Sequence, residues 1–161
     1  MAEGLDRGMK ITYLANYPEH VSTVAKWVID EWGHESPGTT LEGLEEKFRN
    51  HLNRNVIPLT LLAMEEDRPL GTASLVFHNM KDRQDLSPWL AAVYVLPEHR
   101  GQGIGARLVK SIELLAANLE VEKLYLFTPD RESFYTRMGW TVLERTTYRE
   151  KDVVIMMKEI L

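Results

Sequence analysis

The chain has 161 residues, a formal net charge of −5 and no cysteine. This length suits one domain, and the absence of cysteine excludes disulfides, thiolate metal ligands and a catalytic thiol. The acidic balance argues against a general nucleic-acid binder, which would carry a basic face. No apolar run is long enough to span a bilayer. The polar start of the chain lacks the apolar segment of a signal peptide, so we expect a disordered tail over 1–8, a single domain over 9–161 and a cytoplasmic location.

The first 50 residues predict one strand and two helices. A short strand is expected over 10–15. Pro18 marks the start of a helix, because proline suits the first helical turn, and apolar residues then recur at helical spacing as far as Gly33. Thr39 or Thr40 can cap a second helix, since a threonine hydroxyl accepts a hydrogen bond from an unpaired N–H of the first turn.

The middle of the chain predicts three strands and a long helix. The runs 59–65 and 70–78 flank a polar turn and read as an antiparallel hairpin. The nearly unbroken apolar run 89–95 predicts a strand covered on both faces. A helix with an apolar stripe follows over 104–119, and then a strand over 123–128. A strand, a long helix and another strand form a parallel crossover, so we expect 89–95 and 123–128 to be a parallel pair.

The last 30 residues predict a short helix and a final hairpin. The helix is expected over 131–138, and the strands over 140–149 and 153–158. The polar residues 150–152 would form the turn between these two strands. The complete order, β-α-α-β-β-β-α-β-α-β-β, predicts a mixed α/β fold in which a mostly antiparallel sheet contains one parallel pair and is flanked by helices.

Three glycines in five residues, Gly101, Gly103 and Gly105, stand between the predicted buried strand and the long helix. Glycine lets the backbone approach a ligand closely and adopt turns that are closed to other residues. The start of a helix offers unpaired N–H groups and a partial positive charge. Together these features predict an anion site suited to a pyrophosphate.

Two familiar phosphate motifs fit this loop less well. The spacing Gly101-x-Gly103-x-x-Ala106 satisfies the dinucleotide fingerprint, but that fold needs successive parallel crossovers and an acidic residue at the end of the next strand. Here the preceding elements are hairpins, and Asp130 lies beyond the end of the strand. A mononucleotide P-loop needs Lys-Ser or Lys-Thr after the glycines, where this chain has Ala106 and Arg107.

The segment 93–108, VYVLPEHRGQGIGARL, resembles the acetyl-CoA signature of the GNAT superfamily of N-acetyltransferases, whose core is matched by Arg100, Gly103 and Gly105. A second block resembles the family's later strand, short helix and aromatic-Tyr-x-x-x-Gly-aromatic ending: residues 124–128, followed by 134–140. The resemblance covers roughly the last 75 residues, and the first half matches only in the order of its elements.

The resemblance implies a parallel strand pair that splays apart and receives the pantetheine arm of acetyl-CoA, a co-substrate of the reaction. It implies that the backbone of Val93, Tyr94 and Val95 binds this arm, and that the following loop binds the pyrophosphate. Thr128 stands where many family members carry an asparagine that contacts the cofactor. The loop residues implied in cofactor binding are Arg100, Gly101, Gln102, Gly103, Ile104, Gly105 and Ala106.

The same resemblance implies an N-acetyltransferase that passes the acetyl group directly to a primary amine on a small molecule or a peptide N-terminus. Tyr135 matches the usual general acid, which protonates the departing thiolate. The chemistry needs no metal, and the five histidines have no ligand spacing. The alternative is a non-catalytic, regulatory acetyl-CoA-binding domain. The sequence leaves open whether the protein forms a homodimer. Nucleic-acid and membrane partners are not expected.

Two features of the acceptor side stay open. The general base is not identified, since the strand 89–95 contains no acid; Glu31, Asp82, Asp85, Glu98 and a chain of waters are the candidates. Family substrates usually enter between the first two helices and the last hairpin, here 32–40 and 146–153. Four acidic residues would make this mouth favour a cationic acceptor such as a polyamine, an aminoglycoside or a basic peptide N-terminus: Glu31, Glu35, Glu150 and Asp152.

Overall fold

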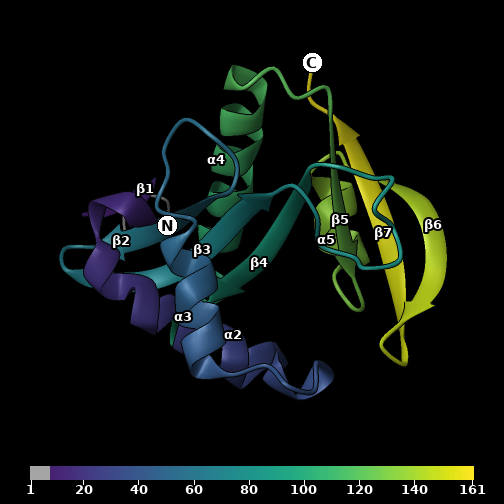
Figure 1. Ribbon diagram of the computed structural model, residues 1–161. Coiled ribbons are helices and arrows are strands. Elements are labelled where there is room, and N and C mark those ends of the chain that lie inside the picture. The colour runs from purple at the N-terminus through teal and green to yellow at the C-terminus, as the bar shows by residue number, and fades with distance from the viewer. Residues whose placement is uncertain (1–7) are drawn as a thin grey trace.

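A seven-stranded sheet with the order β1-β2-β3-β4-β5-β7-β6 organises the protein, as the computed structural model in Figure 1 shows. The structure describes residues 8–161, so the tail expected over 1–8 lies outside it except for Gly8. In this described part, no helix is long and apolar enough to cross a membrane. The strands are β1 (Met9–Tyr13), β2 (Leu59–Glu65), β3 (Arg68–Val76), β4 (Trp89–Val95), β5 (Lys123–Thr128), β6 (Thr141–Tyr148) and β7 (Lys151–Glu159).

Two helices cover one face of the first three strands. α2 (Val21–Trp32) and α3 (Leu41–Arg49) pack their apolar stripes on Leu62 and Met64 of β2. The N–H of Gly43 donates to the Thr40 hydroxyl at 3.0 Å, so Thr40 is the cap of α3. Short 3₁₀ turns replace the ends expected for the first strand and helix: η1 (Leu14–Asn16), η2 (Pro18–His20) and η3 (Gly33–Glu35).

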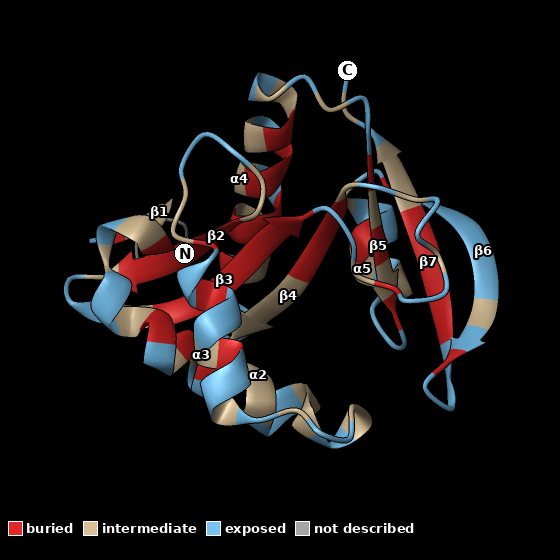
Figure 2. Ribbon diagram, in the orientation of Figure 1, coloured by how far each residue is buried: buried red, intermediate tan, exposed pale blue. Residues whose placement is uncertain are grey.

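The long helix α4 (Ile104–Asn118) covers the opposite face of the sheet. Alternate residues of β2 and β3 point to this side, because successive side chains of a strand face opposite ways. Leu108 and Ile112 of α4 are fully buried among them. Figure 2 shows the result as a buried band through β2 and β3 between two helical layers, whereas the edge strand β6 is largely exposed.

Among the strands of residues 8–161, β4 and β5 are the one parallel pair, as the sequence predicts, but they pair only at one end. The register joins Trp89 to Tyr125, and the Tyr125 N–H donates to the Pro88 carbonyl at 3.1 Å. The strands then diverge (Figure 1). The sequence prediction that the whole of β4 is covered on both faces is therefore wrong: Trp89–Ala91 are buried, whereas residues 92–95 are half-buried because they border the resulting gap.

The C-terminal part closes the sheet beyond β5. β7 pairs antiparallel with both β5 and β6, and the short helix α5 (Glu132–Arg137) connects β5 to β6. The final hairpin turns at Arg149 and Glu150, which have positive φ values of 52° and 67°. This is a two-residue turn, so Lys151 and Asp152 belong to β7 rather than to the three-residue turn that the sequence predicts.

Candidate active site

A cleft of about 810 Å³ occupies the gap between β4 and β5. It extends from the N-terminus of α4 to the C-terminal end of α2, and α3, α5 and the β6–β7 hairpin also contribute side chains. Ten of the twelve site residues predicted from the sequence line it, and Gln102 and Ala106 do not. A single feature, the divergence of two strands, thus collects most of the predicted residues.

The glycine loop ends in an open helix N-terminus at this cleft. Gly101 and Gly103 have φ values of 77° and 84°, in the left-handed region that glycine adopts without strain. Gly103 is the N-cap of α4 and offers no side chain, and the Arg107 N–H makes the first helical bond, to the Gly103 carbonyl at 3.1 Å. The N–H groups that precede it have no acceptor in the helix, and the first turn contains no acidic residue. This end of the cleft is therefore suited to a phosphate group.

The β4 backbone presents alternate groups to the gap. The Leu96 N–H donates to the Leu70 carbonyl of β3 at 2.9 Å, and Tyr94 is the register partner of Thr72. Because the N–H and C=O groups of successive residues point to opposite sides of a strand, Val95 directs its groups away from β3 and toward the gap. The backbone of Tyr94 instead pairs with β3. The centre of its ring lies 5.4 Å from the centre of the Trp27 ring of α2.

A β-bulge precedes these residues. Two residues of β4, Ala92 and Val93, stand opposite Ala73 of β3, and Ala92 has a positive φ of 54°. A bulge leaves one residue outside the ladder and redirects the backbone around it. Unpaired backbone groups therefore become available in the middle of the cleft, next to the predicted pantetheine site.

Arg100 and Thr128 hold the local backbone as well as lining the cleft. The Arg100 Nε donates to the Val95 carbonyl at 2.8 Å, and its guanidinium carbon lies 5.4 Å from the centre of the Tyr94 ring. The Thr128 hydroxyl accepts hydrogen bonds from the N–H groups of Asp130 and Arg131 at 3.4 and 3.1 Å, so it fixes the turn that leads into α5. Arg100, in the loop after β4, and Thr128, at the end of β5, thus shape the cleft from its two sides.

Tyr135 lies on α5 at the cleft and is 7% exposed. Phe134 and Trp140 hold its ring at centroid distances of 4.9 and 6.0 Å. Its hydroxyl forms no hydrogen bond within residues 8–161, yet it is not among fully buried polar atoms without a partner, so it opens into the cleft. Burial raises the pKa of Tyr135 to about 12, while the nearby Arg131 opposes this shift. The phenol is therefore protonated at neutral pH.

The family model described as "Acetyltransferase (GNAT) domain" matches residues 58–142, which is more than half of the chain. The chain belongs to the GNAT acetyltransferase family. This membership confirms the resemblance seen in the two sequence blocks, and the matched region contains the glycine loop, both splayed strands and Tyr135.

Solved structures show the same fold for nearly the whole chain of this GNAT protein. An aminoglycoside 6′-N-acetyltransferase complexed with coenzyme A is 18% identical, with a TM-score of 0.72 over 94% of this chain and 97% of that one. An acetyltransferase of the GNAT family from Streptococcus pneumoniae is 16% identical, with a TM-score of 0.69 over 94% and 98%. Ard1 from Thermoplasma volcanium is 12% identical, with a TM-score of 0.72 over 96% and 99%.

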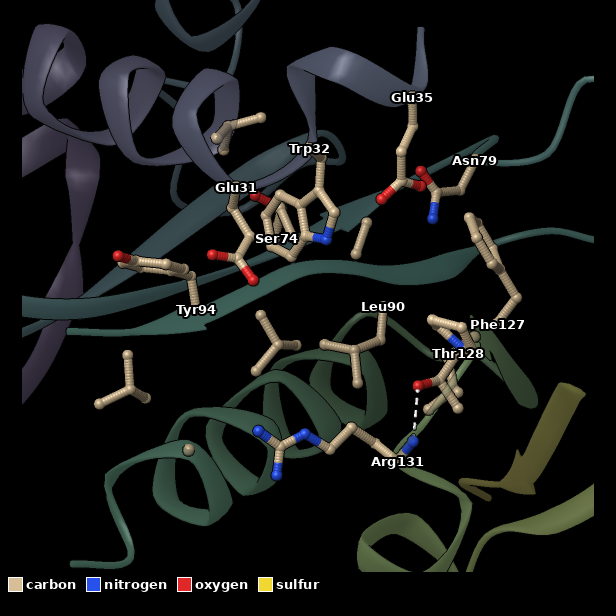
Figure 3. A pocket seen from close by; sticks show the side chains of 18 of the residues that line it. Glu31, Trp32, Glu35, Ser74, Asn79, Leu90, Tyr94, Phe127, Thr128 and Arg131 are labelled. Carbon is tan, nitrogen blue, oxygen red and sulfur yellow. Dashed lines mark hydrogen bonds between the residues drawn. The ribbon is translucent and has the colours of Figure 1, made fainter. Parts of the chain in front are cut away.

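The other half of the GNAT cleft faces α2. Figure 3 shows Glu31, Trp32 and Glu35 pointing from α2 and η3 toward β4, while Thr128 and Arg131 lie on the other side of this strand. Of the four residues considered as a base, only Glu31 lines the cleft. A connection across its mouth joins η3 to the hairpin, because the Lys151 Nζ lies 3.0 Å from Glu35 Oε2.

The hairpin presents basic rather than acidic side chains to the cleft. Arg149 and Lys151 line it, whereas Glu150 and Asp152 do not. The two-residue turn at 149–150 explains the difference: it shifts the start of β7 to Lys151, and alternate residues then face the cleft. The expected acidic mouth is thus only half present, with Glu31 and Glu35 on its α2 side.

A chain of buried polar side chains, which the sequence did not reveal, reaches the half of the cleft that faces α2. His51, after α3, is joined through Nδ1 to the Thr60 hydroxyl at 2.9 Å, and Thr60 is joined to the Ser74 hydroxyl at 2.7 Å. His51 and Ser74 both line the cleft. Burial, followed by the charge of Lys47, lowers the pKa of His51 to about 4. The imidazole is therefore neutral at pH 7 and is too weak a base to deprotonate an amine.

The low pKa of His51 predicts a loss of stability in mild acid. Since the folded state binds this proton more weakly than the unfolded state, with pKa values of about 4 and 6.5, the contribution is complete above pH 6.5 and is lost as the pH falls toward 4. We expect the free energy of unfolding to fall by about 3 kcal/mol from this group between pH 6.5 and pH values below 4. Urea unfolding at several pH values measures it. His51→Gln should flatten this part of the profile, whereas His78→Gln, at an exposed position, should not. Equal slopes in all three proteins would contradict this account.

Proposed function

We propose that this protein transfers an acetyl group from acetyl-CoA to a primary amine. The observation that carries the proposal is that the open α4 N-terminus and Tyr135 line one cleft, together with the half-buried residues 92–95 of β4. The first site suits a pyrophosphate and the second offers a protonated phenol. When bound there, acetyl-CoA would supply an activated acetyl thioester.

The residues of the cleft fit such a molecule in three places. The unpaired N–H groups at the start of α4 would bind the pyrophosphate, and a side chain at Gly103 would intrude there. The backbone of Val93 and Val95 would hold the pantetheine arm in the gap that β5 leaves. An amide of the bulged part of β4 would steady the oxygen of the acetyl group as it gains charge. These roles use backbone groups, which explains why small residues occupy the loop.

Acetyl-CoA binding tests the cofactor assignment directly. We expect calorimetry to show saturable binding of acetyl-CoA to the isolated protein, and little competition from NADH or ATP, because neither has an arm that fits between diverging strands. Clear NADH binding without acetyl-CoA binding would overturn the proposal and restore the dinucleotide interpretation of the glycine loop.

We further propose that Glu31 accepts the proton from the attacking amine. It is the one carboxylate among the sequence candidates that lines the cleft, and Figure 3 shows it pointing toward β4. Glu31→Gln keeps the shape but removes the base, so we expect kcat/KM to fall by about 10² near pH 7, at the low end for general base catalysis. The deficit should shrink at higher pH, where the free amine already forms in solution. Equal activity of the variant and the wild type near pH 7 would contradict this role for Glu31 and would indicate that water removes the proton.

A further inference from the structure

Two cationic side chains line the acceptor half of the cleft. Lys47 extends from α3, and Arg149 belongs to the tight turn between β6 and β7, about 100 residues later in the chain. Both line the cleft together with Glu31 and Glu35 on the α2 side. The fold therefore brings two positive charges from separate walls toward one space.

Neither charge is neutralised by the protein. Among residues 8–161, no carboxylate forms an ion pair with Lys47 or Arg149, although the whole chain has 24 acidic residues against 19 basic ones. Glu35, on the α2 side of the cleft, is already paired with Lys151 at 3.0 Å. Arg149 lies over the Tyr148 ring, at 4.8 Å from its centre, which orients the guanidinium without cancelling its charge.

The two groups are also close enough to oppose each other. Loss of surrounding water lowers the pKa of Lys47, and the charge of Arg149 lowers it further. The neighbouring His51 is neutral at pH 7 and so adds no further positive charge. Lys47 and Arg149 are nevertheless exposed, so solvent screens part of this repulsion and an anion from solution can reach both side chains. Perturbed charges in a cleft are a common mark of a binding site.

This pair is separate from the end of the cleft that suits phosphates. That end is formed by the glycine loop and the start of α4, whereas α3 packs with α2 on the opposite face of the sheet. An anion held by Lys47 and Arg149 would therefore belong to the acceptor, not to acetyl-CoA. Glu31 lies on the same side and can receive the positively charged amine end.

We propose that the acceptor is an amine that also carries an anionic group, such as the carboxylate of an amino acid, and that Lys47 and Arg149 bind this group. The proposal rests on the proposed function, since it names the acceptor of that reaction. It replaces the cationic acceptor expected from the sequence, because Glu150 and Asp152 lie outside the cleft. A zwitterionic acceptor satisfies the acidic α2 side and the basic α3 and hairpin side together.

The test compares amino acids with their carboxamides, which keep the amine and the size but lack the negative charge. We expect wild-type protein to prefer the carboxylate member of each pair by 10-fold or more in kcat/KM, as for a hydrogen bond between charged groups. The double variant Lys47→Met with Arg149→Gln should lose this preference and retain its KM for acetyl-CoA. Lys123→Met and Glu150→Gln, which change charges outside the cleft, should retain the preference.

Binding of the same pairs to the protein saturated with CoA separates this proposal from the proposed function, because it needs no turnover. A carboxylate preference in binding that depends on Lys47 and Arg149 supports the anion site even where acetyl transfer is absent, and that absence then counts against the proposed function alone. Three results would overturn the anion site: a preference for the carboxamide, a carboxylate preference unchanged in the double variant, or acetylation of Lys47 itself detected by mass spectrometry.

Discussion

Gly103→Asp should abolish acetyl-CoA binding, whereas Gly103→Asn should weaken it only a few-fold. Gly103 has a φ of 84° at the N-cap of α4, and Asn and Asp are the non-glycine residues that best tolerate this conformation. The two variants therefore share nearly the same backbone strain and size and differ in one negative charge. A carboxylate about 4 Å from a phosphate charge costs about 4 kcal/mol in a partly screened site, which is about a 10³-fold loss of affinity.

Calorimetry with acetyl-CoA measures this difference, and circular dichroism checks that both variants fold. Raising the salt concentration should partly rescue the Asp variant, because its defect is electrostatic. Similar affinities for the Asp and Asn variants would contradict the placement of the pyrophosphate at the start of α4, whatever the absolute affinity of either.

Tyr135→Phe should lower kcat by about 10² and leave the KM for acetyl-CoA nearly unchanged. The change keeps the ring, which packs against Phe134 and Trp140, and removes only the hydroxyl that opens into the cleft. General acid catalysis is typically worth 10²–10⁴ in rate. We place the effect at the small end because a phenol with a pKa near 12 is a weak acid and water can partly replace it.

A matched control and the pH profile sharpen this prediction. Tyr125→Phe removes a hydroxyl from β5, where the ring packs on Trp89 and does not line the cleft, so kcat should not change. Because burial holds the pKa of Tyr135 near 12, its ionisation should cause no alkaline loss of activity below about pH 11. Full kcat in a folded Phe variant, under conditions where chemistry limits the rate, would make Tyr135 a packing residue.

The strands that the sequence predicts best are those with clear local boundaries. The limits of β2, β4 and β5 agree with the expected 59–65, 89–95 and 123–128, because turn residues flank apolar runs there. The final turn was misplaced because Arg149 and Glu150 adopt positive φ values without glycine or asparagine to signal them. That shift of the turn decides which side chains of the hairpin enter the cleft.

The two halves of the site differ in how far the sequence could predict them. The cofactor half lies in one contiguous segment from Val93 to Gly105, where loop, helix start and strand backbone follow directly from local chemistry. The acceptor half is assembled from residues as distant as Glu31, Lys47 and Arg149, and only the tertiary fold brings these together. His51 gave no signal either, because its partner Thr60 stands on another element.

Amine-dependent release of free thiol from acetyl-CoA tests the central claim most directly. The account predicts that purified protein releases CoA only when a primary amine is present, that mass spectrometry finds the amine acetylated, and that Tyr135→Phe slows both signals by the same factor. Saturable acetyl-CoA binding without thiol release or acetylated product, across cationic, neutral and zwitterionic amines, would contradict it and would favour a regulatory domain that binds acetyl-CoA without catalysis.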